Sequence, residues 1–224
     1  ANGSSLAAVI VEPLCQAAAG IRFYPSQFLT ELRALCDAHE LLLIADEIAV
    51  GFGRTGKMFA CEHAGIVPDL LCLGKALTAG YLPMSTLIVR DEVFEPFLTA
   101  PYPDRVLWDG HTFCGNPITA AAAIAALDVY QERQLPASAG ERMAQLSAGF
   151  EAIAAHPAIA HSRSLGMIGM CEVRAEAGGA ALARRVCARA GTRPVRASAG
   201  PSALSVAPPH RGPAGPRADA DHSH

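Results

Sequence analysis

The sequence predicts an α/β protein built on a mainly parallel sheet. Three apolar runs, at 6–11, 41–45 and 70–73, are continuous rather than alternating, which is typical of strands covered on both faces. Apolar residues recur at helical spacing between the first two runs, so strand, helix and strand follow one another as in a βαβ unit. Of the 224 residues, 51% are hydrophobic and 17% are charged, which is enough apolar material for a core.

Further helices and a strand complete the predicted order of elements. Ser26 follows Pro25 and is a suitable N-cap residue, so the first helix is predicted to start there. Asn116 followed by Pro117 is typical of a helix start and predicts an Ala-rich helix that ends near Arg133. Beyond it, the pattern predicts a helix over 138–155, a strand over 165–173 and a helix over 179–190.

The chain therefore divides into three predicted regions. Residues 1–133 belong to a large α/β domain, 134–190 to a truncated α+β small domain, and 191–224 to an atypical tail. The tail is rich in Ala, Pro, Gly, Arg and Ser and has one Leu but no Ile or Phe. It predicts disorder because it cannot bury enough apolar surface, and its composition is also typical of out-of-frame translation of a GC-rich gene.

Charge and apolar patterning argue against several classes of protein. The net charge is −3, so no basic surplus indicates binding to nucleic acid or an anionic membrane. No apolar run has the length of a bilayer-spanning helix. The seven cysteines are scattered without a Cys-x-x-Cys pair, which argues against disulfides and a zinc site and favours the cytoplasm. We predict no metal.

The segment 51–57, GFGRTGK, has the spacing of a nucleotide-binding P-loop. Met58 follows the lysine where that motif needs Ser or Thr for magnesium. The segment also lies just after an acidic strand end instead of on an earlier strand of its own. We interpret it as a glycine-rich connection and set a nucleotide hydrolase aside.

Three predicted strands lead into ionisable residues, namely Glu12, Asp46 and Lys75, and α/β sheets bind ligands at the carboxyl ends of their strands. Asp46 and Lys75 together fit pyridoxal phosphate (PLP). A lysine amine condenses with the PLP aldehyde, and a carboxylate favours the protonated pyridine nitrogen. Taken singly, Asp46 also fits a loop or capping charge, and Lys75 a solvated surface side chain.

A longer stretch carries a family resemblance. The run ADEIAVGFGRTGKMFACEHAGIVPDLLCLGKALTAGYLPMS, over 45–85, closely resembles the class III aminotransferases of PLP fold type I. The segments ACEHAGIVPD, GYLP and DGHTFCGNP are most similar to members of that family that act in biotin synthesis. The resemblance extends over about 6–194 and implies the PLP-dependent transferase fold of type I. The N-terminal half of the family has no counterpart here, so we expect a fragment that does not catalyse transamination alone.

The resemblance also implies the cofactor-binding residues. Lys75 matches the catalytic lysine that binds PLP covalently, and Asp46 matches the partner of the pyridinium nitrogen. His111 and Thr112 match a pair that contacts the cofactor phosphate from the other subunit of a homodimer. Glu12 matches a glutamate close to the cofactor.

The substrate site is implied in the same way. Gly110 matches a substrate-contacting position, and Arg193 matches an arginine that binds the substrate carboxylate, a task suited to a guanidinium. The implied reaction converts 8-amino-7-oxononanoate to 7,8-diaminononanoate with S-adenosylmethionine as amino donor. Two alternatives stay open: another class III aminotransferase acting on ω-amino acids or diamines, and a catalytically silent remnant.

Overall fold

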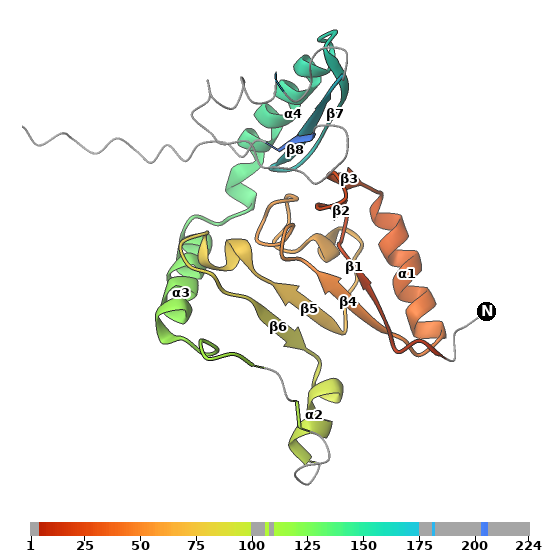
Figure 1. The fold of residues 1–224 in the computed structure, drawn as a ribbon, viewed down its shortest axis with the longest axis vertical. Coiled ribbons are helices and arrows are strands. Elements are labelled where there is room, and N and C mark those ends of the chain that lie inside the picture. The colour runs from red at the N-terminus through yellow and green to blue at the C-terminus, as the bar shows by residue number, and fades with distance from the viewer. Residues whose placement is uncertain (1–4, 100–105, 108–109, 175–180, 182–202, 206–224) are drawn as a thin grey trace, which may run out of the picture.

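A computed structural model describes residues 5–99, 106–107, 110–174, 181 and 203–205 of the chain (Figure 1). The first part forms a four-stranded sheet flanked by helices, and a second group of elements with its own sheet follows along the chain. The predicted α/β class is confirmed. None of the helices in the described ranges combines the length and apolar character needed to cross a membrane.

The main sheet has the strand order β1-β4-β5-β6. Strands β1 (Ala8–Val11), β4 (Leu42–Asp46) and β5 (Leu70–Leu73) are parallel to one another. They correspond to the three apolar runs, so the prediction of a mainly parallel sheet is confirmed. Strand β6 (Thr86–Val89) pairs antiparallel with β5 at one edge and was not predicted.

Helix α1 (Ser26–Ala38) connects β1 to β4 and lies beside the sheet (Figure 1), with Leu29 and Cys36 buried. The prediction that Ser26 is the N-cap is wrong, because Pro25 occupies that position and Ser26 is the first helical residue. Pro25 has an extended backbone, and its carbonyl accepts the N–H of Phe28 at 3.2 Å. Before the helix, β2 (Cys15–Gln16) and β3 (Arg22–Phe23) form a short hairpin.

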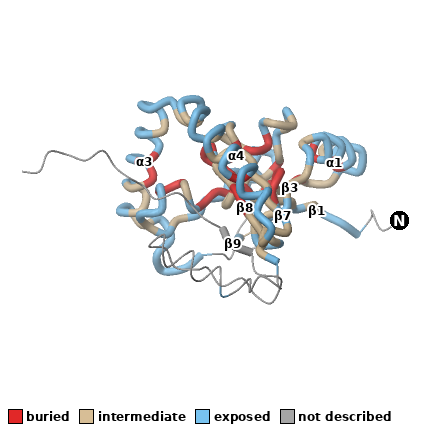
Figure 2. The backbone as a smooth tube through the Cα atoms, turned by 90° about the horizontal axis from the view of Figure 1, so that it is seen from above, coloured by how far each residue is buried: buried red, intermediate tan, exposed pale blue. Residues whose placement is uncertain are grey.

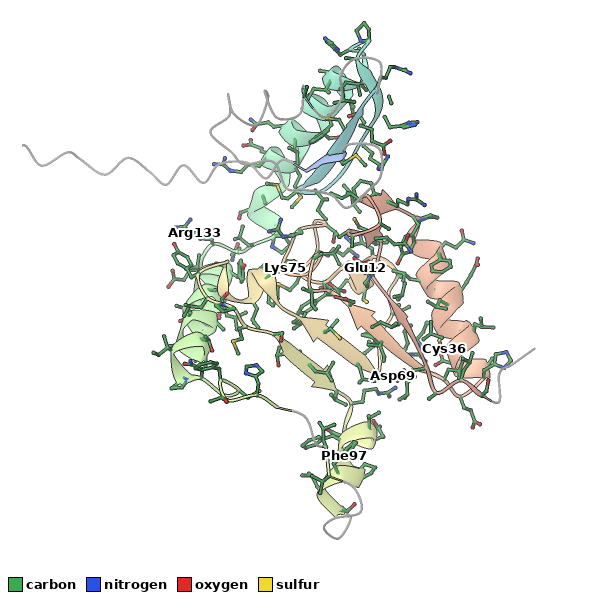
Figure 3. The ribbon with its side chains drawn as sticks, viewed as in Figure 1. Glu12, Cys36, Asp69, Lys75, Phe97 and Arg133 are labelled. Carbon is green, nitrogen blue, oxygen red and sulfur yellow. The ribbon has the colours of Figure 1, made fainter. Side chains whose placement is uncertain are left out.

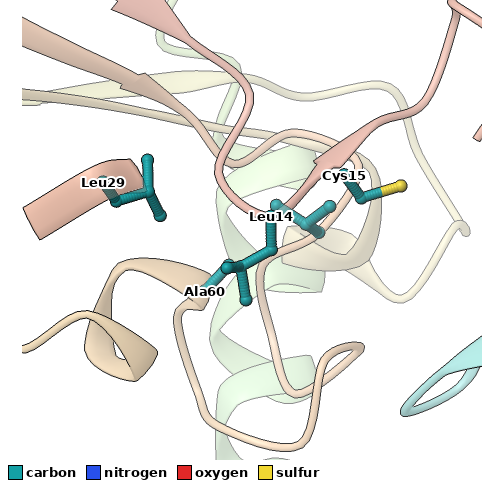
Figure 4. Packing of buried hydrophobic residues seen from close by; sticks show 5 residues of the cluster. Leu14, Cys15, Leu29 and Ala60 are labelled. Carbon is teal, nitrogen blue, oxygen red and sulfur yellow. The ribbon is translucent and has the colours of Figure 1, made fainter. Parts of the chain in front are cut away.

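Two hydrophobic clusters hold the helices and loops to the sheet. The first gathers side chains from the hairpin, α1 and the loops after β4 (Figure 4): Leu14, Cys15, Leu29, Val50 and Ala60. The second joins β5 to helix α3 (Pro117–Glu132) and to the 3₁₀ turn η3 (Lys75–Thr78): Phe52, Leu73, Leu77 and Ala123. The buried residues gather in the middle of the molecule, and the outer surface of α1 is exposed (Figure 2).

The connection from β6 to α3 contains helix α2 (Asp91–Thr99), which extends away from the sheet (Figure 1) and buries none of its residues. Pro96 lies inside it, and the sequence analysis did not predict this helix. The predicted start of α3 is confirmed: the Asn116 side chain accepts the N–H of Ile118 at 2.9 Å, and Pro117 is the first helical residue.

The second group of elements packs a helix on a sheet. The short turn η4 (Ala137–Ala139) leads into α4 (Gly140–Ala154), and β7 (Ile159–Leu165) and β8 (Ile168–Val173) form an antiparallel hairpin. The prediction of a single strand over 165–173 is wrong at its start, because Gly166 has a φ of 57° and turns the chain there. A glycine adopts this left-handed conformation without steric cost.

The tail contains a third strand. Residues Ala203–Ser205 form β9, antiparallel to β8, so the prediction of disorder is wrong for these residues. They belong to the one apolar stretch of the tail, ALSV, and the free edge of β8 offers them backbone partners. The rest of the tail lies outside the described residues, as does the helix predicted over 179–190 apart from residue 181, which is helical.

An ion cluster around the buried Asp69 lies at the amino end of the parallel strands. The Asp69 carboxylate accepts the Leu43 N–H at 2.7 Å and bonds the guanidinium groups of Arg33 at 2.7 Å and Arg90 at 2.8 Å. Burial raises the pKa of Asp69, but the Leu43 amide and the two arginines outweigh that effect and lower it to about 2. The charged carboxylate therefore stabilises the fold.

We expect Asp69→Asn to lower the free energy of unfolding by about 2 kcal/mol at neutral pH. The folded pKa lies below the unfolded one, so this stabilisation is complete above about pH 4 and is lost as the pH falls towards 2. Urea unfolding at pH 7 and pH 3 measures both effects. Asp37→Asn is the matched control, because Asp37 bonds the same Arg33 but its side chain is 65% exposed; a loss there as large as at Asp69 would contradict the assignment.

Candidate active site

The ends of the three parallel strands meet at one edge of the sheet (Figure 3), where Glu12 and Lys75 lie far from Asp69. Asp46 is the last residue of β4 and is in register with Cys72 of β5. The N–H of Glu47 donates to the Cys72 carbonyl at 3.0 Å, which extends this pairing past Asp46. Lys75 follows three residues after Cys72, so the acid and the amine leave adjacent strands at the same edge.

Asp46 is fixed through one carboxylate oxygen. Its Oδ1 accepts the N–H of Ile48 at 3.0 Å, a local bond that turns the chain after the strand. Its Oδ2 takes no hydrogen bond from the residues that the structure describes. The side chain is half-buried, so one oxygen is held in place and the other is available to a ligand.

Lys75 begins the turn η3 with a φ of 43°. This left-handed conformation is uncommon outside glycine, and it is often found at functional sites. The preceding Gly74 lies close to Ile48, where an added Cβ would come within 3.4 Å of Cγ2. The Tyr130 hydroxyl of α3 donates to the Ala76 carbonyl at 2.7 Å and fixes the turn from outside. The Lys75 side chain is exposed and thus open to a ligand.

Glu12 has a structural task at the same edge. Its Oε2 accepts the N–H of Ala17 at 2.9 Å, and its carbonyl accepts the Tyr24 hydroxyl at 2.5 Å. Burial is the main reason that the pKa of Tyr24 is raised to about 12. Glu12 therefore ties the end of β1 to the loop and hairpin that follow.

The other predicted site residues do not join this group. Gly110, His111 and Thr112 are exposed and precede the first turn of α3. Tyr130, near the other end of that helix, contacts η3. The hydrogen bonds of His111 are local, with Phe113 and Cys114. Arg193 lies outside the described residues.

The sequence analysis did not assign a role to Glu47, the residue after Asp46. Glu47 is 0% exposed, and its two carboxylate oxygens accept the N–H groups of Ala60 at 2.7 Å and Cys61 at 2.8 Å. These amides open the turn η2 (Ala60–His63). Burial raises the pKa of Glu47, although both amide bonds lower it. The feature of the sequence that could have identified Glu47 is its position, as an acidic residue, directly after an apolar run and Asp46.

The segment 51–57, which has the spacing of a P-loop, is a connection, as the sequence analysis predicted. The Lys57 ammonium group donates to the Glu62 carbonyl at 3.0 Å, and the segment leads into η2 instead of an α-helix. Gly51 lies against Glu47, and its N–H donates to the Glu47 carbonyl at 2.8 Å. The loop therefore packs behind the strand end that carries Asp46.

Comparison with known proteins decides the family. The sequence matches the class-III aminotransferases over residues 1–211. The chain belongs to the class III aminotransferase family. It is similar to the adenosylmethionine-8-amino-7-oxononanoate aminotransferases of Nitratidesulfovibrio vulgaris (41% identity, 78% of this chain) and Synechococcus elongatus (42% identity, 78% of this chain). The matched region spans only 32% and 40% of the length of those relatives.

Solved structures of transaminases share the fold. An (S)-enantioselective omega-transaminase from Thermomicrobium roseum matches 93% of this chain with a TM-score of 0.81 and 29% identity. The ornithine delta-aminotransferase of Plasmodium falciparum matches 91% with a TM-score of 0.77 and 27% identity. The match covers 47% and 49% of those chains. The prediction of family and fold is confirmed.

We expect Gly51→Ala to lower the free energy of unfolding by about 1–3 kcal/mol. The new Cβ would lie 2.9 Å from the Glu47 carbonyl oxygen, which belongs to rigid backbone. Gly149→Ala is the matched control, because a Cβ there meets no atom within 4 Å. Inside α4 it should stabilise the chain by about 0.5–1 kcal/mol. Thermal unfolding compares the two; equal stability of both variants would show that Gly51 is not required for close approach.

Proposed function

We propose that this chain carries part of the active site of a PLP-dependent transaminase that converts 8-amino-7-oxononanoate to 7,8-diaminononanoate, with S-adenosylmethionine as amino donor. The observation that carries the proposal is the placement of Asp46 and Lys75 on adjacent parallel strand ends. Family membership supports transamination, and the relatives named above support the substrate. The chain spans less than half of their length, so the activity of the whole protein is part of the proposal.

The residues at the sheet edge fit PLP. The cofactor needs an amine at its aldehyde and a carboxylate near the ring nitrogen, across the width of one ring. Lys75 is exposed at the end of β5, and the Oδ2 atom of Asp46 has no protein partner in the described part of the chain. The two groups leave neighbouring strands, so a flat ring can lie between them. PLP would be held covalently by Lys75 and oriented by Asp46.

Each residue has a separate task in transamination. When bound, PLP supplies the electron sink that lets the substrate lose its α-proton. Asp46, as a carboxylate, holds a proton on the ring nitrogen by opposite charge. The Lys75 Nζ atom, as a neutral amine, accepts the substrate proton and returns it, acting as general base and acid. Glu12 keeps the end of β1 beside this pair through its bond to Ala17.

The exposure of His111 and Thr112 supports a homodimer. Both residues are exposed in the single chain, and the family resemblance assigns them to the phosphate of a cofactor on the other subunit. In a dimer, the Thr112 hydroxyl and nearby amides would bind the phosphate of the cofactor on the partner. Exposed apolar side chains lie beside them, as an interface requires: Leu107 (70%), Phe113 (73%) and Ile118 (69%).

Substrate binding and location complete the proposal. Gly110 and Arg193 would contact the substrate. The Arg193 guanidinium would bind the carboxylate of the substrate. An aminotransferase for ω-amino acids or diamines is the second assignment, favoured by the structural similarity to the omega-transaminase; substrate profiling of a full-length relative separates the two. The free thiols of the six described cysteines support a location in the cytoplasm, where thiols stay reduced.

Borohydride trapping tests the cofactor site directly. The sequence has only two lysines, Lys57 and Lys75, so peptide mapping after reduction with PLP has a clear outcome. We expect the label on Lys75 and its loss in Lys75→Ala. Lys57→Ala is the matched control and should keep the label. A label on Lys57, or no label on the wild-type chain, would contradict the proposal and favour the silent remnant.

Mixing two variants tests the shared site. We expect Lys75→Ala and Thr112→Val each to lose trapped PLP at limiting cofactor. If each site combines Lys75 of one chain with Thr112 of the other, each mixed dimer has one intact site and one site that lacks both residues. Random mixing makes about half of the dimers mixed, so about a quarter of all sites recover. Quantifying trapped PLP by mass spectrometry measures this. No recovery in mixtures of chains that do dimerise would place both residues in one chain's site.

A further inference from the structure

Glu47 is an unusual neighbour for a cofactor carboxylate. It follows Asp46 directly, is fully buried, and uses both oxygens to accept the amides of Ala60 and Cys61. An ionised carboxylate in this position has a high desolvation cost, which its two amide bonds offset only in part. An apolar residue of similar size would avoid that cost but would leave both amides without a partner. The acid therefore has a task that packing alone does not explain.

The contacts of Glu47 converge on the backbone that orients Asp46. Its own N–H is bonded to the Cys72 carbonyl of β5 at 3.0 Å, and its carbonyl accepts the N–H of Gly51 at 2.8 Å. Its side chain joins this peptide to η2, which is thirteen residues away. The next amide, that of Ile48, is the one bonded to the Oδ1 atom of Asp46 at 3.0 Å. The backbone over 46–48 is thus held from three directions.

We propose that Glu47 is a positioning residue that fixes the orientation of the Asp46 carboxylate toward the cofactor ring. The inference rests on the proposed function, because it assigns Glu47 a part in the PLP site. Through its two amide bonds, Glu47 anchors the peptide that precedes Ile48. The Ile48 amide then holds Oδ1 and leaves Oδ2 directed at the ligand. A purely structural role would anchor η2 and leave Asp46 unaffected.

Hydrogen exchange in the ligand-free chain separates these two roles. Glu47→Gln keeps the size of the side chain but can accept only one of the two amides without opposing another donor. We expect faster exchange at Ala60, Cys61 and also Ile48, measured by NMR. Glu62→Gln is the matched control, because the Oε1 atom of Glu62 accepts the Phe59 amide at 2.8 Å in the same turn. Its amide oxygen can still accept the Phe59 N–H, and exchange at Ile48 should stay as in the wild type.

A double-mutant cycle on PLP affinity gives the second readout. We expect Glu47→Gln to weaken PLP binding about tenfold, as for a lost hydrogen bond to a buried charge. Asp46→Asn combined with Glu47→Gln should bind no more weakly than Asp46→Asn alone, because Glu47 acts through Asp46. Glu62→Gln should bind PLP like the wild type.

Each outcome decides a different point. Unchanged exchange at Ile48 in folded Glu47→Gln, or fully multiplicative losses of affinity in the double variant, would overturn the positioning role. If Glu47→Gln does not fold, Glu47→Asp repeats both measurements with the charge kept and the reach shortened; wild-type values for it would also overturn the role. A wild-type chain that binds no PLP contradicts the proposed function, whereas the exchange result still decides whether Glu47 orients Asp46.

Discussion

The register between β4 and β5 is the constraint on which the site depends. Asp69 holds this register at the amino end, where its N–H donates to the Leu43 carbonyl and its carboxylate accepts the Leu43 N–H. Three residues further along both strands, Asp46 is paired with Cys72. A slip of one residue would send the Asp46 side chain to the other face of the sheet, where Leu43 and Ala45 are buried. The Asp69 carboxylate at one end of the sheet therefore determines where the Asp46 carboxylate emerges at the other.

Two buried carboxylates in this sheet illustrate opposite ways of satisfying a charge. Asp69 has two guanidinium partners besides its amide, and its pKa falls. Among the described residues, Glu47 has only backbone amides and the Cys61 thiol as partners, and its pKa rises because burial dominates. Full cationic partners offset desolvation, whereas amide dipoles do so incompletely. The first arrangement suits a permanent structural tie. In the second arrangement, no lysine or arginine among the described residues is bonded to Glu47, the neighbour of Asp46.

The sequence predicted those parts of the fold that depend on local pattern. The three parallel strands have continuous apolar runs, and α3 has a clear start at Asn116 and Pro117. The strands and the helix could therefore be predicted from the sequence. Strand β6 was missed because its pairing to β5 is decided by tertiary contact, and its residues are largely exposed. Helix α2 was missed because Pro96 interrupts its pattern. Asp46 and Lys75 were identified from strand ends, but Glu47 was not, because its role depends on Ala60 and Cys61, which no local spacing connects to it.

Helix α3 connects the core beside Lys75 to an exposed amino end. It is fixed along its length, with Ala123 of its first half in the core beside Leu77 and Tyr130 near its end bonded to η3. Pro117 and Ile118 at its start, and residues 110–115 before it, are exposed. Because α3 packs on η3, which begins at Lys75, one helix both fixes the turn that carries the lysine and carries Thr112 just before its exposed amino end.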